Sequence, residues 1–539
     1  MHEYLLSLLI FLPLLGAFIV LMLPTETYHG RSISLLIAVL QVLVFTFILA
    51  AYDTSLTGLQ LAERAQWISL TMGSWGEVRA DYFVALDGLS LPLLGLSVFI
   101  FIIATLSSWK VEKSRKGYFA LLLVLNAAVM GTFCAQDFLL FYLFFEFMLL
   151  PMFFLIGIWG GVRREYASIK FFLYTLLGSI LILIVMIALL LSTKSSNDAG
   201  TVVHSFSIND MTNPANILSQ SVLDPQRGLE LFGISVRVWA FIFLFIGFGI
   251  KLPMVPVHTW LPDAHVEAPT AISVLLAALL LKIGGYGLLR ITYPLFPDAA
   301  MQLSWLVALF GVVSIIYGAL AAMASKDLKR LIAYSSVSHM GFVLLGVASV
   351  TTEGAAGAVY QMVSHGVISA MLFILVGVLY DRTHDRMIEN YSGLSSKMPV
   401  YFSYTLLAFF ASLGLPGFSG FMAEIMVFLG AFKSNGVNGL IHESFAIVAT
   451  LGLVLGAAYY LWTLQRMFFG KYHFKSSTEN TSLVDLDKRE ILMLLPLALI
   501  TIAFGIFPQL LLNFINPFAE SFNETVLQTG KAIHTLIRP

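Results

Sequence analysis

Long apolar runs separated by short polar segments dominate the sequence. About 14 of these runs have the roughly 20 mostly apolar residues that a helix needs to cross the hydrocarbon core of a membrane. The pattern therefore predicts an all-α polytopic membrane protein with about 14 transmembrane helices. The first run, over residues 3–23, has no basic segment before it and no small-residue cleavage site, so we expect a retained helix rather than a signal peptide.

Several segments outside these runs also carry structural signals. Residues 53–82 and 193–235 are polar and turn-rich, and each is long enough to be structured. The alternation over residues 202–208 predicts a short surface hairpin, and the apolar run over 83–108 predicts the third helix. After the last run, residues 517–537 predict an interfacial helix with one apolar face.

Composition narrows the class of protein further. Hydrophobic residues make up 58% of the 539 residues and charged residues only 11%, whereas soluble proteins have about 25% charged residues. These values exclude a soluble enzyme, a disordered protein and a nucleic-acid-binding protein. The single cysteine, Cys134, cannot form an intrachain disulfide or hold an iron–sulfur cluster or zinc by itself. We therefore expect no cofactor and no metal on this chain.

The placement of basic residues predicts the orientation in the membrane. Most of the Lys and Arg residues lie in the loops that follow the odd-numbered runs. Because basic loops stay on the cytoplasmic side, these loops are predicted to be cytoplasmic and both termini to lie on the opposite side.

Four ionisable residues interrupt the apolar runs, namely Glu146, Lys251, Lys282 and Glu424. A charged side chain at the centre of the bilayer costs roughly 2.5–3.5 kcal/mol on insertion scales, so such residues need a reason to be there. Burial disfavours the charged form and a neighbouring opposite charge restores it, which suits groups that take up and release protons. The alternative is that each charge only hydrogen-bonds a neighbouring helix or extends to the membrane surface.

Two of these residues lie next to predicted helix breaks. Lys251 is followed by Pro253 and Pro256, and Glu424 follows a segment with Pro416 between glycines. Proline removes a backbone donor, and carbonyls freed inside the membrane must line a polar cavity or contact protein. The sequence therefore predicts broken helices over 236–261 and 399–432, each beside an ionisable group.

Histidines provide a second set of candidates. His339 and His365 lie within apolar runs, and histidine exchanges protons near neutral pH, although a packed, hydrogen-bonded core histidine is the alternative reading. The His and acidic residues over 258–267 lack a recognised zinc spacing, so we predict no metal site there. The charged residues over 326–330 fit a solvated anchor at the start of a helix.

The two predicted breaks are five helices apart, which suggests two copies of one five-helix unit. Because five is odd, the second copy must be inverted in the membrane, and inverted repeats with broken helices are typical of transporters. The predicted divisions are residues 1–116 for helices 1–3, 117–292 and 301–470 for the two repeats, and 490–539 for helix 14 and the interfacial helix.

Three motifs resemble a known family. The sequences FFEFMLLP over 144–151, KLP…HTWLPDAH…AP over 251–269 and SKDLKRLIAYSS over 325–336 are similar to those of the antiporter-like subunits of respiratory complex I. The superfamily also includes multisubunit cation/proton antiporters. The resemblance covers about helices 4–13, which is the greater part of the chain.

The resemblance implies a proton-translocating subunit of NADH:quinone oxidoreductase. The L-type, N-type and large antiporter subunits typically have lysine at the second break and M-type chains have glutamate, which matches Glu424. The positions of Glu146, Lys251 and Lys282 correspond to the core of the family's proton path, which His339, His365 and Glu424 extend. The implied partners are L-type and N-type chains in a bacterial inner membrane, with FMN and iron–sulfur clusters in other subunits and both termini periplasmic.

These residues also suggest a mechanism. We expect Glu146 and Lys251 to form an ion pair whose strength controls the charge on Lys251 and drives the proton on Lys282 onward through the second half. Phosphate-binding loops such as GxGxxG and GxxxxGK[ST] are absent, so the energy must come from a redox partner. A cation/proton antiporter subunit, a ferredoxin-linked photosynthetic relative and a membrane scaffold with vestigial charges are the alternatives.

Overall fold

The computed structural model describes residues 4–24, 29–73, 76–196, 202–475 and 483–537. In this part of the chain, 12 helices are long and apolar enough to cross a membrane. Nine of them are continuous helices: α1 (Leu5–Met22), α2 (His29–Ala51), α3 (Ser90–Ser107), α4 (Arg115–Cys134), α7 (Arg164–Ser192), α14 (Pro297–Met323), α15 (Leu328–Ser349), α16 (Thr352–Thr383) and α21 (Lys488–Ile506). The span of α3 includes the short helical turn that follows it. Three combine consecutive segments: α5 (Phe138–Phe147) with α6 (Leu149–Trp159), α11 (Thr270–Leu275) through α13 (Tyr293–Leu295), and α19 (Ser444–Ala449) with α20 (Leu451–Phe468).

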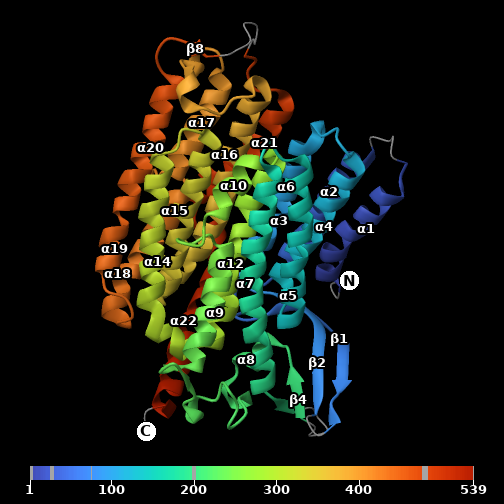
Figure 1. Ribbon diagram of the computed structural model, residues 1–539, viewed down its shortest axis with the longest axis vertical. Coiled ribbons are helices and arrows are strands. Elements are labelled where there is room, and N and C mark those ends of the chain that lie inside the picture. The colour runs from blue at the N-terminus through green and yellow to red at the C-terminus, as the bar shows by residue number, and fades with distance from the viewer. Residues whose placement is uncertain (1–3, 25–28, 74–75, 197–201, 476–482, 538–539) are drawn as a thin grey trace.

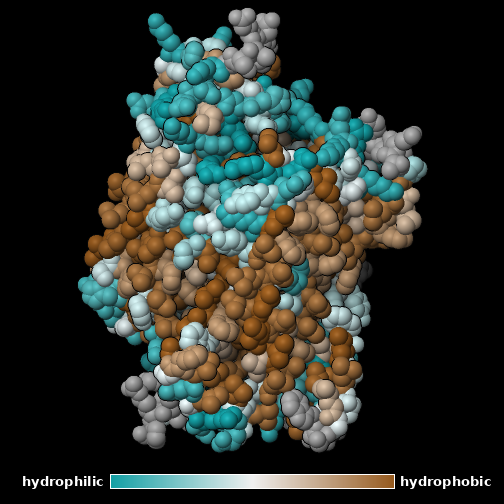
Figure 2. All heavy atoms as spheres, in the orientation of Figure 1, coloured by the Kyte–Doolittle hydropathy of each residue, from teal (hydrophilic) through white to brown (hydrophobic). Residues whose placement is uncertain are grey.

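The helices run side by side along the long axis of the molecule (Figure 1), and hydrophobic residues cover their middle on the face that Figure 2 shows. Hydrophilic residues gather at the end where β8 (His473–Phe474) and α17 (Pro399–Ser412) lie. We call this end, with the loops around residues 108–117, 160–164, 324–328 and 384–399, the basic end. A mostly helical membrane protein is therefore confirmed.

A four-stranded sheet covers part of the opposite end, which we call the hairpin end (Figure 1). The long strands β1 (Gln60–Thr71) and β2 (Glu77–Leu86) are antiparallel, and β2 also pairs in parallel with β4 (Val202–Ser205). The prediction of a hairpin over 202–208 was therefore only partly right, because β4 takes β2 and the two-residue β3 (Ser195–Ser196) as its partners.

The third helix begins later than the sequence predicts. Residues 83–86 belong to β2, and α3 begins only at Ser90. The Asp87 carboxylate accepts hydrogen bonds from the backbone N–H groups of Leu89 and Ser90, which fixes the start of the helix. Four apolar residues fit a strand as well as a helix, so the hydrophobic pattern alone could not place this boundary.

Two further apolar segments are interrupted. Helix α9 (Val236–Lys251) ends at Lys251, and α10 (Trp260–Glu267) begins after a gap that contains Pro253 and Pro256. Helix α17 ends at Ser412, and α18 (Ser419–Val437) begins after a gap that contains Pro416. Each interruption leaves backbone groups without helical partners in the middle of the bundle.

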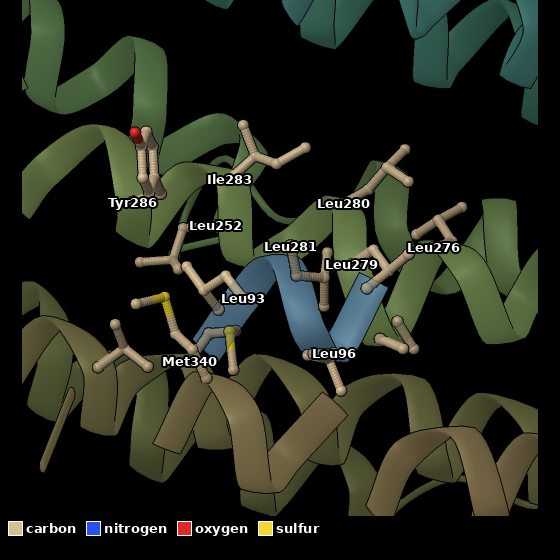
Figure 3. Packing of buried hydrophobic residues seen from close by; sticks show 14 of the residues in the cluster. Leu93, Leu96, Leu252, Leu276, Leu279, Leu280, Leu281, Ile283, Tyr286 and Met340 are labelled. Carbon is tan, nitrogen blue, oxygen red and sulfur yellow. The ribbon is translucent and has the colours of Figure 1, made fainter. Parts of the chain in front are cut away.

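The most buried helices lie at the centre of the bundle. Within the apolar windows of α11–α13 and α16 every residue is buried, and 94% are buried in α15. Figure 3 shows how Leu93 and Leu96 of α3 pack between Leu279 and Leu281 of the first of these segments and Met340 of α15. The outer helices α1, α2 and α7 instead expose rows of apolar side chains.

The C-terminal helix α22 (Gln509–Ile537) is longer than the predicted interfacial helix over 517–537. Its buried side chains include Phe522, Val526 and Ile533, and it packs against α14 and α16. In Figure 1 it runs down to the C-terminus at the hairpin end.

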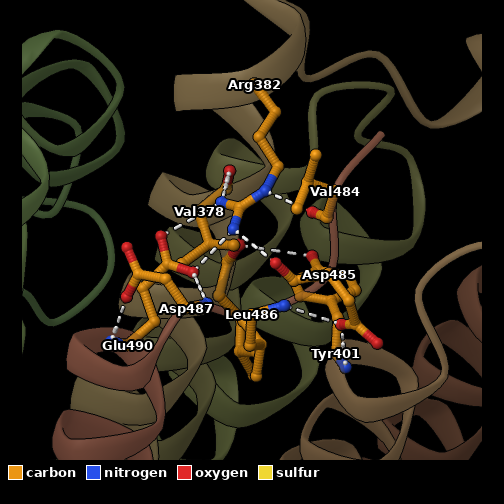
Figure 4. Close-up of polar contacts among 9 residues, drawn as sticks. Val378, Arg382, Tyr401, Val484, Asp485, Leu486, Asp487 and Glu490 are labelled. Atoms are coloured by element: carbon orange, nitrogen blue, oxygen red, sulfur yellow. Dashed lines mark hydrogen bonds and ion pairs between the residues drawn. The ribbon is translucent and has the colours of Figure 1, made fainter. Parts of the chain in front are cut away.

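A polar network at the basic end joins α16, α17 and α21 (Figure 4). Arg382 of α16 donates to the Glu490 carboxylate, at 2.6 Å for the shorter bond, and to the backbone carbonyls of Val484 and Asp485. Asp485 accepts from the backbone N–H groups of Val400 and Tyr401 at the start of α17. The network holds these three helix ends in a fixed arrangement.

Candidate functional site: a buried line of ionisable residues

Four of the residues selected from the sequence form one line inside the bundle. The ammonium nitrogen Nζ of Lys282 lies 2.7 Å from Nδ1 of His365 and 2.5 Å from the carbonyl oxygen of Ala277. The rings of His365 and His339 are 5.3 Å apart, and Nε2 of His339 is 3.9 Å from a carboxylate oxygen of Glu424. All four side chains are at most 7% exposed.

Lys251 and Glu146 lie beside this line but do not touch each other. Lys251 is the last residue of α9 and is 2% exposed, and its ammonium group lies 4.5 Å from the centre of the Phe145 ring. Among the described residues, that ammonium group has no hydrogen-bond partner and no ion pair within 4 Å. Glu146 of α5 is only half-buried and lies beside Ser179 of α7. The direct ion pair that we expected from the sequence is therefore not present, and the two charges interact at longer range.

Glycines bring Lys282 close to the end of α9. Lys282 lies in α12 (Leu281–Gly287), which is flanked by two π-helical segments, Leu276–Leu280 and Leu288–Thr292. A Cβ atom on Gly284 would lie 2.5 Å from the backbone nitrogen of Leu252, the residue that follows Lys251. Only glycine therefore permits this close approach, and π-helical turns often occur at functional sites.

The second interruption makes room for Glu424. Gly414 and Gly417 both have positive φ angles, and a Cβ atom on Gly414 would lie 2.2 Å from a carboxylate oxygen of Glu424. Nε2 of His339 donates to the carbonyl oxygen of Ser412 at the end of α17, at 3.0 Å. The broken helix thus supplies both the space for the carboxylate and a carbonyl acceptor for the histidine.

A cavity of about 780 Å³ opens at the basic end, and we call it the vestibule. Its lining includes Lys110, Glu267, Lys329, Asp381 and Arg489. Lys329 is 6% exposed, so the prediction of a solvated anchor over 326–330 was wrong for this residue, although it fits the exposed Lys326.

The structure also shows polar residues that the sequence analysis did not select. Arg290 and Asp87 form a buried ion pair at 2.5 Å near the hairpin end, next to Tyr286 and Ser90. Lys329 lines the vestibule, and His265 is buried within electrostatic reach of both Lys329 and Lys282. The sequence analysis considered Lys329 and His265 only as parts of a solvated anchor and of a rejected metal site, because hydropathy does not show that they are buried.

One buried carboxyl group outside the membrane-spanning helices, that of Asp137, also has a shifted pKa. Asp137 caps α5 by accepting from the backbone N–H of Leu140, and it also accepts from the backbone N–H of Asp81. Burial raises the pKa of Asp137 to about 6, against the stabilising effect of these hydrogen bonds.

Comparison with known proteins agrees with this geometry. The family described as "NADH:quinone oxidoreductase/Mrp antiporter, TM" matches residues 135–450. NADH-quinone oxidoreductase subunit M of Rhodobacter capsulatus is 40% identical over 520 residues, which cover 96% of this chain and 95% of that protein. A chain in the structure of respiratory complex I from Thermus thermophilus with bound NADH has a TM-score of 0.80 and 30% identity, and the match covers 97% of this chain and 99% of that chain.

A chain of the Mrp complex from a Dietzia species has a TM-score of 0.79 at 20% identity over 99% of both chains, which shows a shared fold alone. The fold and the line of buried charges define an antiporter-like membrane subunit. Within that class, the chain belongs to the NADH:quinone oxidoreductase/Mrp antiporter family, in its NADH-quinone oxidoreductase subunit M group.

Proposed function

We propose that this chain carries protons across the membrane along Lys282, His365, His339 and Glu424 as an antiporter-like subunit of NADH-quinone oxidoreductase. The observation that carries the proposal is the buried series of close contacts from Lys282 to Glu424. Each member binds and releases a proton, and the series crosses from α12 through α16 and α15 to α18.

Lys251 and Glu146 control the charge on this line. Lys251 ends the interrupted helix α9 next to the segment that carries Lys282, so its positive charge opposes a second charge on Lys282. When Glu146 comes closer to Lys251, its negative charge favours the charged form of Lys251. When Glu146 moves away, Lys251 loses its proton more readily. Because Glu146 is half-buried, a neighbouring subunit can act on it from outside the chain.

The architecture supports a finer topology. Adding the interrupted pairs α9/α10 and α17/α18 to the 12 candidate spans of the described residues gives about 14 membrane crossings. Helices 4–8 (117–292) and 9–13 (301–470) then form two inverted repeats, between the N-terminal helices of 1–116 and the C-terminal part of 490–539. The basic end faces the cytoplasm of a bacterial cell and both termini face the periplasm.

The energy for transport comes from other subunits. L-type and N-type antiporter-like chains are the proposed neighbours, and FMN and iron–sulfur clusters in the rest of the complex transfer electrons from NADH to quinone. Glu424 favours this function over that of a cation/proton antiporter subunit, since lysine is typical of the antiporter chains at that position.

Proton transport in inverted membrane vesicles tests the proposal. Cells that lack this chain are complemented with the wild type, with Glu424→Gln or with Lys282→Met, and NADH-driven acidification is followed with a fluorescent amine. We expect both variants to lose most of the pumping while a native gel still shows the assembled, NADH-oxidising complex. Full pumping by both variants would refute the proposed path, and sodium-driven proton exchange without NADH would favour the antiporter.

A further inference from the structure

His265 is a buried histidine that the path described above does not use. It lies in α10 with no exposed surface, and its ring stacks on Phe373 of α16 with centroids 4.4 Å apart. Among the described residues, neither ring nitrogen has a hydrogen-bond partner. A polar ring buried without partners is costly, so a role beyond packing is needed to explain it.

Lys329 lies next to this histidine and reaches the vestibule. Its ammonium group donates to the carbonyl oxygen of Ala268, at 2.5 Å, at the C-terminal end of the helix that carries His265. The same side chain lines the vestibule, whereas Lys326, three residues earlier, is exposed. Lys329 is therefore a buried basic group that both lines the vestibule and contacts the end of the helix that carries His265.

His265 lies within electrostatic reach of Lys329 on one side and of Lys282 on the other, and it also interacts with His365. The residues that directly follow His265, 266–268, line the vestibule. Phe373, on which the His265 ring stacks, lies on the same helix as His365, the partner of Lys282. His265 thus combines an unpartnered titratable ring with a place next to residues that line the vestibule.

We propose that His265 passes protons from Lys329 to Lys282 and so supplies the buried line from the vestibule. This inference rests on the proposed function. Lys329 gives a proton to one ring nitrogen of His265, the other ring nitrogen gives a proton through water to the Lys282 amine, and Lys329 is reprotonated from vestibule water. Atoms and charge balance, because one proton moves inward at each step.

Repulsion between the positive charges on Lys329, His265 and Lys282 determines when a proton can move inward. A proton on Lys282 opposes a second positive charge on His265, and a charged His265 opposes the charge on Lys329. The line therefore takes up a new proton only after Lys282 has passed its own proton to His365. Uptake from the basic end is thereby linked to release in the second half of the chain.

Two variants separate proton transfer from a structural role. His265→Gln keeps a polar group of similar size but cannot carry a proton. Lys329→Arg keeps the positive charge and a donor for Ala268, which would satisfy a helix cap, but arginine does not release its proton. Matched controls are His258→Gln, a buried histidine seven residues before His265, and Lys326→Arg.

NADH-driven acidification in inverted vesicles is measured per assembled complex, across pH and with added imidazole. We expect both variants to lose at least about tenfold in pumping rate, with a steeper loss as pH rises, and the controls to keep the wild-type rate. Imidazole, which the vestibule admits, is expected to restore part of the rate in His265→Ala.

Wild-type pumping and pH dependence in Lys329→Arg or His265→Gln, with Lys282→Met inactive, would overturn this inference and leave the proposed function intact. Wild-type pumping in Lys282→Met would instead overturn the proposed function itself. A loss in His265→Ala that imidazole leaves unchanged at every pH would mean a packing role for the ring and would also overturn the inference.

Discussion

Gly284→Ala tests whether the close packing of α12 against the end of α9 sets the geometry of Lys282. The new Cβ atom would meet the Leu252 nitrogen at 2.5 Å and the Phe248 carbonyl oxygen at 2.6 Å, whereas ordinary contact begins at 3.4 Å. Both are backbone atoms that no side-chain rotation can move. The helix carrying Lys282 must therefore retreat by about 0.9 Å, the difference between these contacts.

The expected effect on stability is small and the expected effect on transport is large. Overpacking costs about 1–3 kcal/mol, and the better helix propensity of alanine returns about 1 kcal/mol. A net loss of about 0–2 kcal/mol leaves the complex assembled. A displacement of about 1 Å at a reacting group can cost about 100-fold in rate, so we expect NADH-driven proton transport to fall at least about tenfold.

The assay is acidification of inverted vesicles, normalised to assembled complex on a native gel. Gly456→Ala in α20 is the matched control, because Gly456 is also a buried helical glycine but a Cβ atom there meets nothing within 4 Å. Equal transport by Gly284→Ala, Gly456→Ala and the wild type would show that this packing does not position Lys282.

Three further outcomes follow from single contacts. Asp137→Asn removes a carboxyl group whose folded-state pKa of about 6 exceeds its ordinary value of 3.8. The wild type should therefore lose about 2 kcal/mol of stability as pH rises from 4 to 6 and the variant should not; equal thermal midpoints at pH 5 and pH 7 in both would contradict this. Arg382→Met removes the ion-pair partner of the buried Glu490 carboxylate and should destabilise the chain by about 3–5 kcal/mol. A lower thermal midpoint would show this loss of stability, and an unchanged midpoint would contradict the prediction. Gly414→Ala should displace the Glu424 carboxylate and reduce proton transport while NADH oxidation by the assembled complex continues; unchanged transport would show that the carboxylate tolerates the added methyl group.

The membrane class and the interrupted helices could be predicted from the sequence because each depends on local composition. A lone glutamate or lysine among apolar residues, such as Lys282, and prolines next to glycines are visible without a structure. The burial of Lys329 could not be predicted, because a lysine near the start of a helix resembles a surface anchor unless the end of α10 is known to pack against it. The ion pair of Arg290 with Asp87 joins residues 203 positions apart, and no periodicity reports such a contact.

The contact between Lys282 and His365 explains why the buried line crosses the molecule at this point. Lys282 belongs to residues 117–292 and His365 to residues 301–470, so a proton that moves along their 2.7 Å contact passes from the first proposed repeat to the second. The same lysine donates to the carbonyl oxygen of Ala277, which lies in the π-helical segment Leu276–Leu280. On the proposed path, a proton transfer from Lys282 to His365 removes the charge that strengthens the bond to Ala277, so this bond weakens. Proton transfer between the two proposed repeats would thus weaken a contact between Lys282 and the segment that precedes it in the chain.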